Sequence, residues 1–160
     1  MMDETWRKFL DVLAKPDQPR AVFAALEALT RETVGTLLFT AMTHDTEALR
    51  SFRIYSGNAT AYPVSGWKPL KPEGPWYQRV IAGKQPFSAL TIEEIAVVFP
   101  DHELIKSLGC ESALNLPAVV AGRVIGTINL LHEKGYYTPA RVAAASALLP
   151  FATIAFLAAT

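Results

Sequence analysis

The chain has 160 residues, of which 51% are hydrophobic, and its formal net charge is zero. This length and composition predict a globular domain whose core needs no disulfide or metal to fold. Because Lys and Arg together equal Asp and Glu in number, we expect no basic field for a phosphate backbone and no nucleic-acid partner. The single cysteine, Cys110, and an acidic rather than basic N-terminal stretch predict a reducing, cytoplasmic setting without a signal peptide.

Two amphipathic helices are expected first. The first shows apolar residues at helical spacing and a prolyl break after it; these residues are Trp6, Phe9, Leu10 and Leu13, and the break spans residues 15–19. The second carries an apolar stripe and ends at Gly35. We therefore divide the chain into residues 1–19, an N-terminal amphipathic helix and linker, and residues 20–160, the main domain.

Four longer strands are expected in two antiparallel hairpins. Residues 36–43 and 49–55 flank a turn at 44–47, and residues 113–120 and 124–131 flank a tight turn near Ala121-Gly122. Strands with apolar residues on both sides predict a sheet that is covered on both faces.

Residues 58–75 form a long Pro- and Gly-rich segment without helical or strand periodicity. A loop of this length inside a compact domain is usually functional. It carries Tyr62 and Trp67, and Trp76 and Tyr77 follow it. These rings either cover the core or line a cavity between the segment and the sheet.

Short helices and one short strand are expected over residues 76–108, and a last helix over residues 140–158. Thr138-Pro139 provides a cap and an N1 proline for that last helix. Residues 142–160 carry no charge, but they are rich in alanine and contain Pro150. We therefore favour a buried helix or a helical interface over a membrane span.

The predicted fold class is α+β: a central antiparallel sheet with helices on one face and a long loop and short helices covering the other. In element order, and in the motifs at residues 108–112, 115–117 and 122–130, the chain resembles a GAF domain, a relative of PAS domains. The resemblance implies a sensory or ligand-binding domain that signals through a downstream protein partner. It names no ligand or cofactor, because members of the family bind different small molecules or none.

The subfamilies differ at residues that this sequence lacks. Cys110 is followed by Glu111, whereas bilin-attaching members usually place a histidine after the cysteine, and the cyclic-nucleotide signature is absent. Free methionine sulfoxide reductases are similar in fold and size but depend on several cysteines. Cys110 has no second thiol in the chain to resolve a sulfenic acid, so we expect a buried, inert cysteine and no enzyme activity.

The predicted ligand site centres on two amides, Asn115 and Asn129, in otherwise apolar strands. Buried amides need partners, so they bond either to neighbouring backbone or across the hairpin, or else to a ligand. His132 and Arg53 are candidates for the rim of the site. With the aromatic residues, the expected ligand-binding set is Tyr55, Tyr62, Trp67, Trp76, Tyr77, Asn115, Asn129 and His132. The three histidines are scattered, so no metal site is expected.

These features lead to three hypotheses about function. The first is a stand-alone, non-enzymatic sensory domain that binds a small molecule between the sheet and residues 58–109 and forms a homodimer through its terminal helices. The second is a dimerisation or interaction module with no ligand. The third is a Cys110-dependent reductase.

Overall fold

The centre of the molecule is a six-stranded antiparallel sheet in the computed structural model, which describes residues 3–64 and 66–160. Its strand order is β3-β2-β1-β6-β5-β4. The strands are β1 (Leu38–Asp45), β2 (Arg50–Ser56), β3 (Trp67–Pro69), β4 (Phe87–Ala89), β5 (Ser112–Val120) and β6 (Arg123–His132). The helices are α1 (Glu4–Leu13), α2 (Arg20–Thr33), α3 (Pro75–Tyr77), α4 (Ile92–Val98), α5 (His102–Ser107), α6 (Pro139–Ala145) and α7 (Leu149–Ala158). A π-helical turn, η1 (Gln78–Ala82), follows α3, and a 3-10 turn, η2 (Ser146–Leu148), joins α6 to α7.

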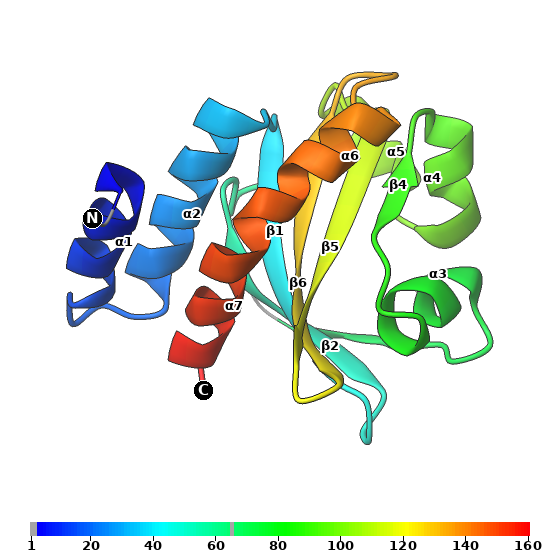
Figure 1. Cartoon of the computed structure of the whole chain (residues 1–160). Helices are drawn as coiled ribbons and strands as arrows, with labels where there is room; N and C mark the ends of the chain where they lie inside the picture. The colour runs from blue at the N-terminus through cyan, green and yellow to red at the C-terminus, as the bar shows by residue number, and fades with distance from the viewer. Residues whose placement is uncertain (1–2, 65) are drawn as a thin grey trace.

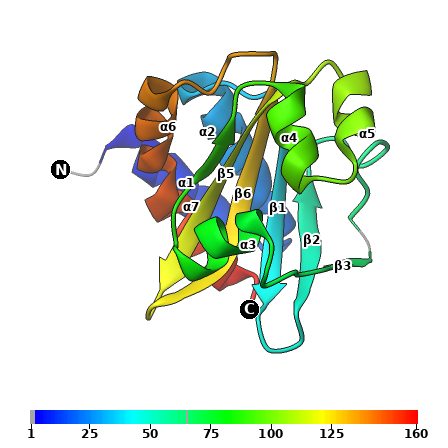
Figure 2. The same cartoon turned by 90° about the vertical axis from the view of Figure 1, so that its right-hand side faces the viewer.

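The sheet is covered on both faces, as Figure 1 shows: α1, α2, α6 and α7 lie on one side, and α3, α4 and α5 on the other. In Figure 2 the short helices α3, α4 and α5 lie in front of the sheet. We call the face under α2 and α7 the core face, and the face under α3, η1, α4 and α5 the site face. The arrangement confirms the predicted α+β fold with a central antiparallel sheet.

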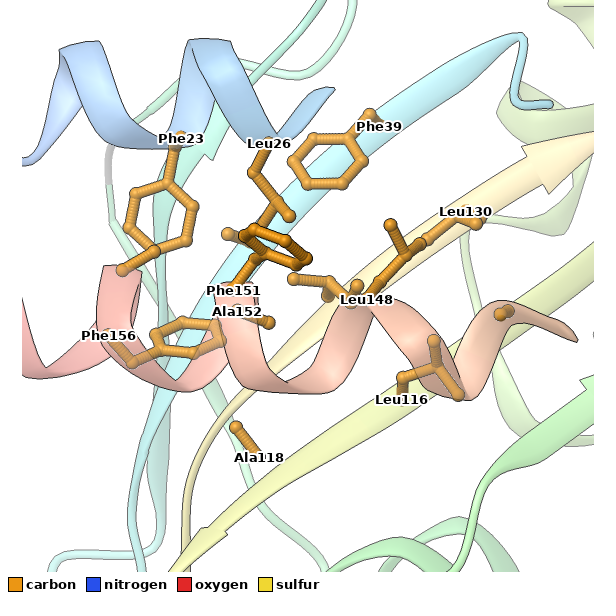
Figure 3. Packing of buried hydrophobic residues seen from close by; sticks show 14 of the residues in the cluster. Phe23, Leu26, Phe39, Leu116, Ala118, Leu130, Leu148, Phe151, Ala152 and Phe156 are labelled. Carbon is orange, nitrogen blue, oxygen red and sulfur yellow. The ribbon is translucent and has the colours of Figure 1, made fainter. Parts of the chain in front are cut away.

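The main hydrophobic core lies between the core face and the helices α2 and α7 (Figure 3). Phe23 and Leu26 of α2 meet Phe156 of α7 above strand residues such as Phe39 and Leu130, and all of these side chains are buried. Each such side chain contributes about 1.5–3 kcal/mol through burial. The core therefore holds the strands in place, and the site face is the opposite side of the same strands.

Residues 139–158 are apolar and long enough to cross a membrane by length and composition. In the fold they form α6, η2 and α7; α7 packs against β5 and β6, with Phe156 on the sheet, while Phe151 meets Trp6 and Phe9 of α1. The Phe156 ring lies over Gly126 of β6, where a Cβ atom would stand 2.6 Å from Phe156 Cζ. Core packing thus accounts for the buried side of this segment, whereas other apolar residues on it, such as Leu157, are exposed.

The tight turn of the β5–β6 hairpin lies at Ala121-Gly122, as the sequence predicts, and its length, which the sequence leaves open, is two residues. Ala121 and Gly122 have φ angles of 51° and 75°, the left-handed pair that such turns require. From the turn outward, Val120 pairs with Arg123 and Val119 with Val124. A register shift then leaves Ile125 as an extra residue on β6, so that Ala118 faces Gly126 and Asn115 faces Asn129.

A β-bulge in β2 breaks the alternation that the sequence predicts. Met42 pairs with Arg53 and Ala41 pairs with Tyr55, so Ile54 is an extra residue on β2. Arg53 therefore faces the site face, whereas both Ile54 and Tyr55 pack against the core cluster. A bulge reverses the face of every following residue on its strand, which decides where Tyr55 lies.

Helix α1 packs on the same core as the later elements. Asp3 Oδ1 caps it by accepting from Thr5 N, Phe9 is buried, and Trp6 stacks on Phe151 with ring centroids 4.2 Å apart. The helix thus contributes to the main hydrophobic cluster. A domain boundary between residues 19 and 20 stays a prediction.

Candidate functional site

A row of polar side chains crosses the site face on three neighbouring strands. Thr40, Asn129 and Asn115 lie opposite one another in register on β1, β6 and β5. Asn115 Nδ2 donates to Asn129 Oδ1 at 2.9 Å, and Asn129 Nδ2 donates to Thr40 Oγ1 at 3.3 Å. Asn115 is only 3% exposed. We call these three residues the amide row.

Trp76 of α3 closes the amide row from above. Its Nε1–H donates to Asn115 Oδ1 at 2.7 Å. The ring lies 5.7 Å from the ring of His44, so it covers the neighbouring part of the same face. Trp76 is therefore the roof of the site and supplies a hydrogen bond that the buried amide needs.

A second polar group surrounds His44 at the end of β1. His44 Nδ1 lies 2.7 Å from Ser51 Oγ, and Nε2 lies 3.0 Å from Thr127 Oγ1. Burial lowers the pKa of His44 to about 4, so the ring is neutral near pH 7. The sequence places His44 in a turn and not in the site. Thr40, Met42 and His44 are alternate residues of β1, so they lie on the same face of the sheet. That alternation in the sequence could have predicted that His44 lies beside the amide row.

The edge of the site near β2 and β3 carries charge. The Arg53 guanidinium stacks over the Tyr62 ring at 4.4 Å, and Tyr62 donates from its hydroxyl to Asp101 Oδ2 at 2.8 Å. Lys68 of β3 contacts the same carboxylate oxygen at 3.3 Å. These bonds hold the pKa of Asp101 below its usual value despite its burial. They also tie Tyr62 and Lys68 to the turn before α5.

The segment that carries Trp76 continues into a small separate cluster. Val80 and Ile81 of η1 pack against Val124 of β6, and Trp76 and Tyr77 lie against them. One π-helical turn forms this contact, and π-helical turns often occur at functional sites. The roof is thus attached to the sheet by few side chains.

The structure brings together only part of the predicted ligand-binding set. Tyr62, Trp76, Asn115 and Asn129 lie over the site face, with Tyr77 beside them. Trp67 pairs on the edge strand β3, where it is 53% exposed and lies under the guanidinium of Arg50.

Two predicted residues lie on the core side of the sheet instead. Tyr55 is turned there by the bulge and donates from its hydroxyl to Glu27 Oε1 at 2.7 Å. His132 stacks on Tyr136 with ring centroids 3.5 Å apart, at the end of β6 beside Tyr137. Both therefore lie apart from the amide row.

The amide row is satisfied within the protein, which is the first of the two alternatives that the sequence leaves open. Trp76, Asn115, Asn129 and Thr40 form one chain of hydrogen bonds. Two open hollows, of about 370 and 220 Å³, lie elsewhere, where α1 meets α2 and where α1 and α2 meet the start of α7. Because Trp76 bonds to Asn115, its ring occupies the position over that amide in this conformation.

Cys110 lies outside the amide row. It is buried in a cluster with Ile95, Ile105 and Tyr62, and burial raises the pKa of its thiol. A raised pKa leaves little thiolate, the nucleophilic form. Among residues 3–64 and 66–160, no group of three or more His, Cys, Asp and Glu side chains is placed to hold a metal ion.

Neither a protein-family model nor a curated protein matches the sequence. Solved structures do match. The GAF domain/HD domain protein from Geobacter sulfurreducens has a TM-score of 0.67 and 20% identity, over 91% of this chain and 94% of that chain. The GAF domain of an Acinetobacter phosphoenolpyruvate-protein phosphotransferase has a TM-score of 0.70 and 11% identity, over 98% and 95%. The chromophore-binding domain of an unusual bacteriophytochrome from R. palustris has a TM-score of 0.62 and 12% identity, over 94% of this chain and 59% of that chain. The chain has the fold of a GAF domain.

Proposed function

We propose that this chain is a non-enzymatic sensory domain that binds a small molecule between the site face and residues 58–109. The observation that carries the proposal is the amide row beneath Trp76. Three polar side chains from three strands lie side by side on a sheet face, and a single aromatic ring on a short helix covers them. A few polar anchors inside an apolar surround is the usual anatomy of a small-molecule site.

Ligand entry requires Trp76 to leave the amide row. The helix that carries it has three residues and continues into a single π-helical turn, so the moving unit is small. A ligand that replaces Trp76 has to return a donor to Asn115 Oδ1, because a buried acceptor without a partner is costly. The proposed signal is this displacement of α3 and η1.

We also propose a homodimer formed through the terminal helices, in a cytoplasmic setting with a downstream protein partner. Support comes from the outward surface of α6, η2 and α7, where Ala143, Ala144, Ala147 and Leu157 are exposed. Leu10 of α1 is 43% exposed in the same helical layer, and Leu157 is 49% exposed. Apolar surface of this kind favours association with a second helical surface.

The test of ligand binding is native mass spectrometry of freshly purified protein against the same sample after denaturation. We expect a non-covalent adduct of defined mass per subunit, which disappears on denaturation. Asn115→Leu, which removes the central anchor, should lose the adduct, whereas the surface variant Val97→Leu should keep it. An adduct-free wild-type protein contradicts the proposal.

The same spectra test the homodimer. Leu157→Glu should give monomer, because it buries a charge in the proposed interface. Val97→Glu is the matched control, since Val97 lies on α4, away from that surface, and is 73% exposed. A monomeric wild type, or a dimer that survives Leu157→Glu, contradicts the proposed interface.

The second candidate is an interaction module without a ligand. The observation that favours it is the complete set of hydrogen bonds between Trp76 and Thr40, which leaves the amides satisfied without a ligand. A wild-type dimer without an adduct, together with an Asn115→Leu variant that still dimerises, supports this candidate. The buried Cys110 gives the reductase hypothesis no comparable support.

A further inference from the structure

Arg53 carries a hydrogen-bond donor that its surroundings leave unused. Its Nε atom is buried. Within residues 3–64 and 66–160, no hydrogen-bond acceptor lies within reach of this atom. Its Nη1 donates to the carbonyl oxygen of Pro63 at 3.3 Å, a long bond for a charged donor. The ring of Tyr62 covers one flat side of the guanidinium at 4.4 Å. One edge of the cation therefore lacks an acceptor in the part of the chain that the structure describes.

The charge of Arg53 is also poorly balanced. Across residues 3–64 and 66–160, the ion pairs within 4.0 Å do not include Arg53. Asp101 acts on it only from a longer distance, and its Oδ2 oxygen is already engaged by Tyr62 and Lys68. Burial accordingly lowers the pKa of Arg53. Arg53 is half-buried and its Nε is fully buried; charged groups withdrawn from water are normally paired, so the unpaired edge of this cation fits an anion.

Arg53 belongs to the same surface as the proposed ligand site. It pairs with Met42 on β1, which in turn pairs with Thr127 on β6. Met42 and Thr127 lie two residues along their strands from Thr40 and Asn129, so Arg53 faces the same side of the sheet as the amide row. Tyr62, which covers it, belongs to the segment that roofs the site. A ligand that contacts both Arg53 and Asn129 therefore has to extend over this face from β2 across β1 to β6.

We propose that Arg53 is the anion anchor of this site and that the ligand is a small molecule with a carboxylate group. A carboxylate that accepts from Nε also reaches Nη2, because these two N–H groups form one side of the planar fork. The neutral His44 and the amide row then contact the uncharged remainder of the ligand. This inference rests on the proposed ligand site.

The test compares Arg53→Met with Arg50→Met, a matched variant on the same strand that removes one charge from an exposed arginine over Trp67. The probes are sodium acetate and sodium benzoate, with sodium chloride at equal ionic strength and neutral benzamide as controls. Thermal unfolding and isothermal titration calorimetry give the midpoint Tm and the affinity.

We expect both carboxylates to raise the Tm of wild type and Arg50→Met in a concentration-dependent manner, beyond the effect of chloride. In Arg53→Met the affinity should fall by about tenfold or more, because a charge-assisted pair is lost. Without probe, the Tm of Arg53→Met should equal or exceed that of wild type, since a half-buried charge without an ion pair has been removed.

Three results overturn the inference. These are carboxylates that act no more strongly than chloride, a carboxylate response that persists in Arg53→Met, and a probe-free Arg53→Met that unfolds well below Arg50→Met. A neutral adduct in native mass spectrometry, or binding of benzamide alone, leaves the proposed ligand site standing and refutes the carboxylate. If wild-type protein shows no adduct and binds neither the carboxylates nor benzamide, the proposed ligand site itself is refuted.

Discussion

The hydrogen bond from Trp76 to Asn115 is the contact on which the proposed site depends, and its strength can be measured. Trp76→Phe keeps an aromatic ring but removes Nε1–H, which donates to Asn115 Oδ1 at 2.7 Å. Because Asn115 is 3% exposed, its oxygen is left without water or protein partner. An unsatisfied buried acceptor costs about 1–3 kcal/mol, so we expect the free energy of unfolding to fall by that amount.

A double-mutant cycle separates this bond from general packing. In an Asn115→Leu background the acceptor no longer exists, so Trp76→Phe should cost less by about 1–2 kcal/mol. Trp67→Phe is the matched control and should stay within about 0.5 kcal/mol of wild type, because its ring is on the exposed edge strand. Urea unfolding measures all of these values. Additive effects of the two substitutions, or equal effects at positions 76 and 67, refute the reasoning.

Three further predictions test the core, the buried histidine and the thiol. Gly126→Ala should destabilise by about 1–3 kcal/mol, because its Cβ meets the Phe156 ring, and Phe156→Leu should restore part of the loss; an additive double variant contradicts this account. As pH falls from about 6.5 toward 4, His44 becomes protonated in the unfolded chain but stays neutral in the native protein. The free energy of unfolding should therefore fall by up to about 1.4 kcal/mol per pH unit. His44→Gln should flatten that part of the urea-derived pH profile, and an unchanged slope assigns it to other groups. Cys110 should react with a thiol reagent about a hundredfold or more slowly in the native protein than in urea, and comparable rates contradict its burial.

The fold could be predicted because its strongest signals are local. The turn at Ala121-Gly122 occupies two residues with positive φ, and Thr138 caps the last helix by accepting from Arg141 N, with Pro139 at N1. The turn joins the two longest strands, and the cap starts α6, which continues through η2 into α7, the helix that packs on those strands. The antiparallel sheet and its GAF fold follow from that order of elements.

Residue positions on the two faces could not be predicted where the strands are irregular. The bulge at Ile54 depends on pairing between β1 and β2, and alternation within β2 alone assigns Tyr55 to the wrong face. β1 also extends to Asp45, whose side chain accepts from the N–H groups of Glu47 and Ala48 and so delays the turn. That delay brings His44 into the site. Both errors come from pairing between strands, which a single-strand pattern does not contain.

The partners of the amides also depend on tertiary packing. The sequence predicts that Asn115 and Asn129 need partners and leaves those partners open, and the register of β5 against β6 makes them partners of each other. Trp76 reaches Asn115 across 39 positions in sequence, a contact that no local spacing specifies. Residue types thus predict which side chains need partners, and only the fold decides which partners they have.

The closed amide row sets a condition on any ligand of the proposed site. A purely apolar molecule that displaces Trp76 leaves Asn115 Oδ1 buried without a donor, and the resulting loss of about 1–3 kcal/mol weakens binding by roughly ten- to a hundredfold. A molecule that donates to Asn115 and also offers a carboxylate to Arg53 avoids that loss and pairs a charge that the free protein leaves unpaired. The free protein is therefore stable but incompletely satisfied at one edge of the site. That combination favours ligands with a donor at one end and an acid at the other over apolar ligands of equal size.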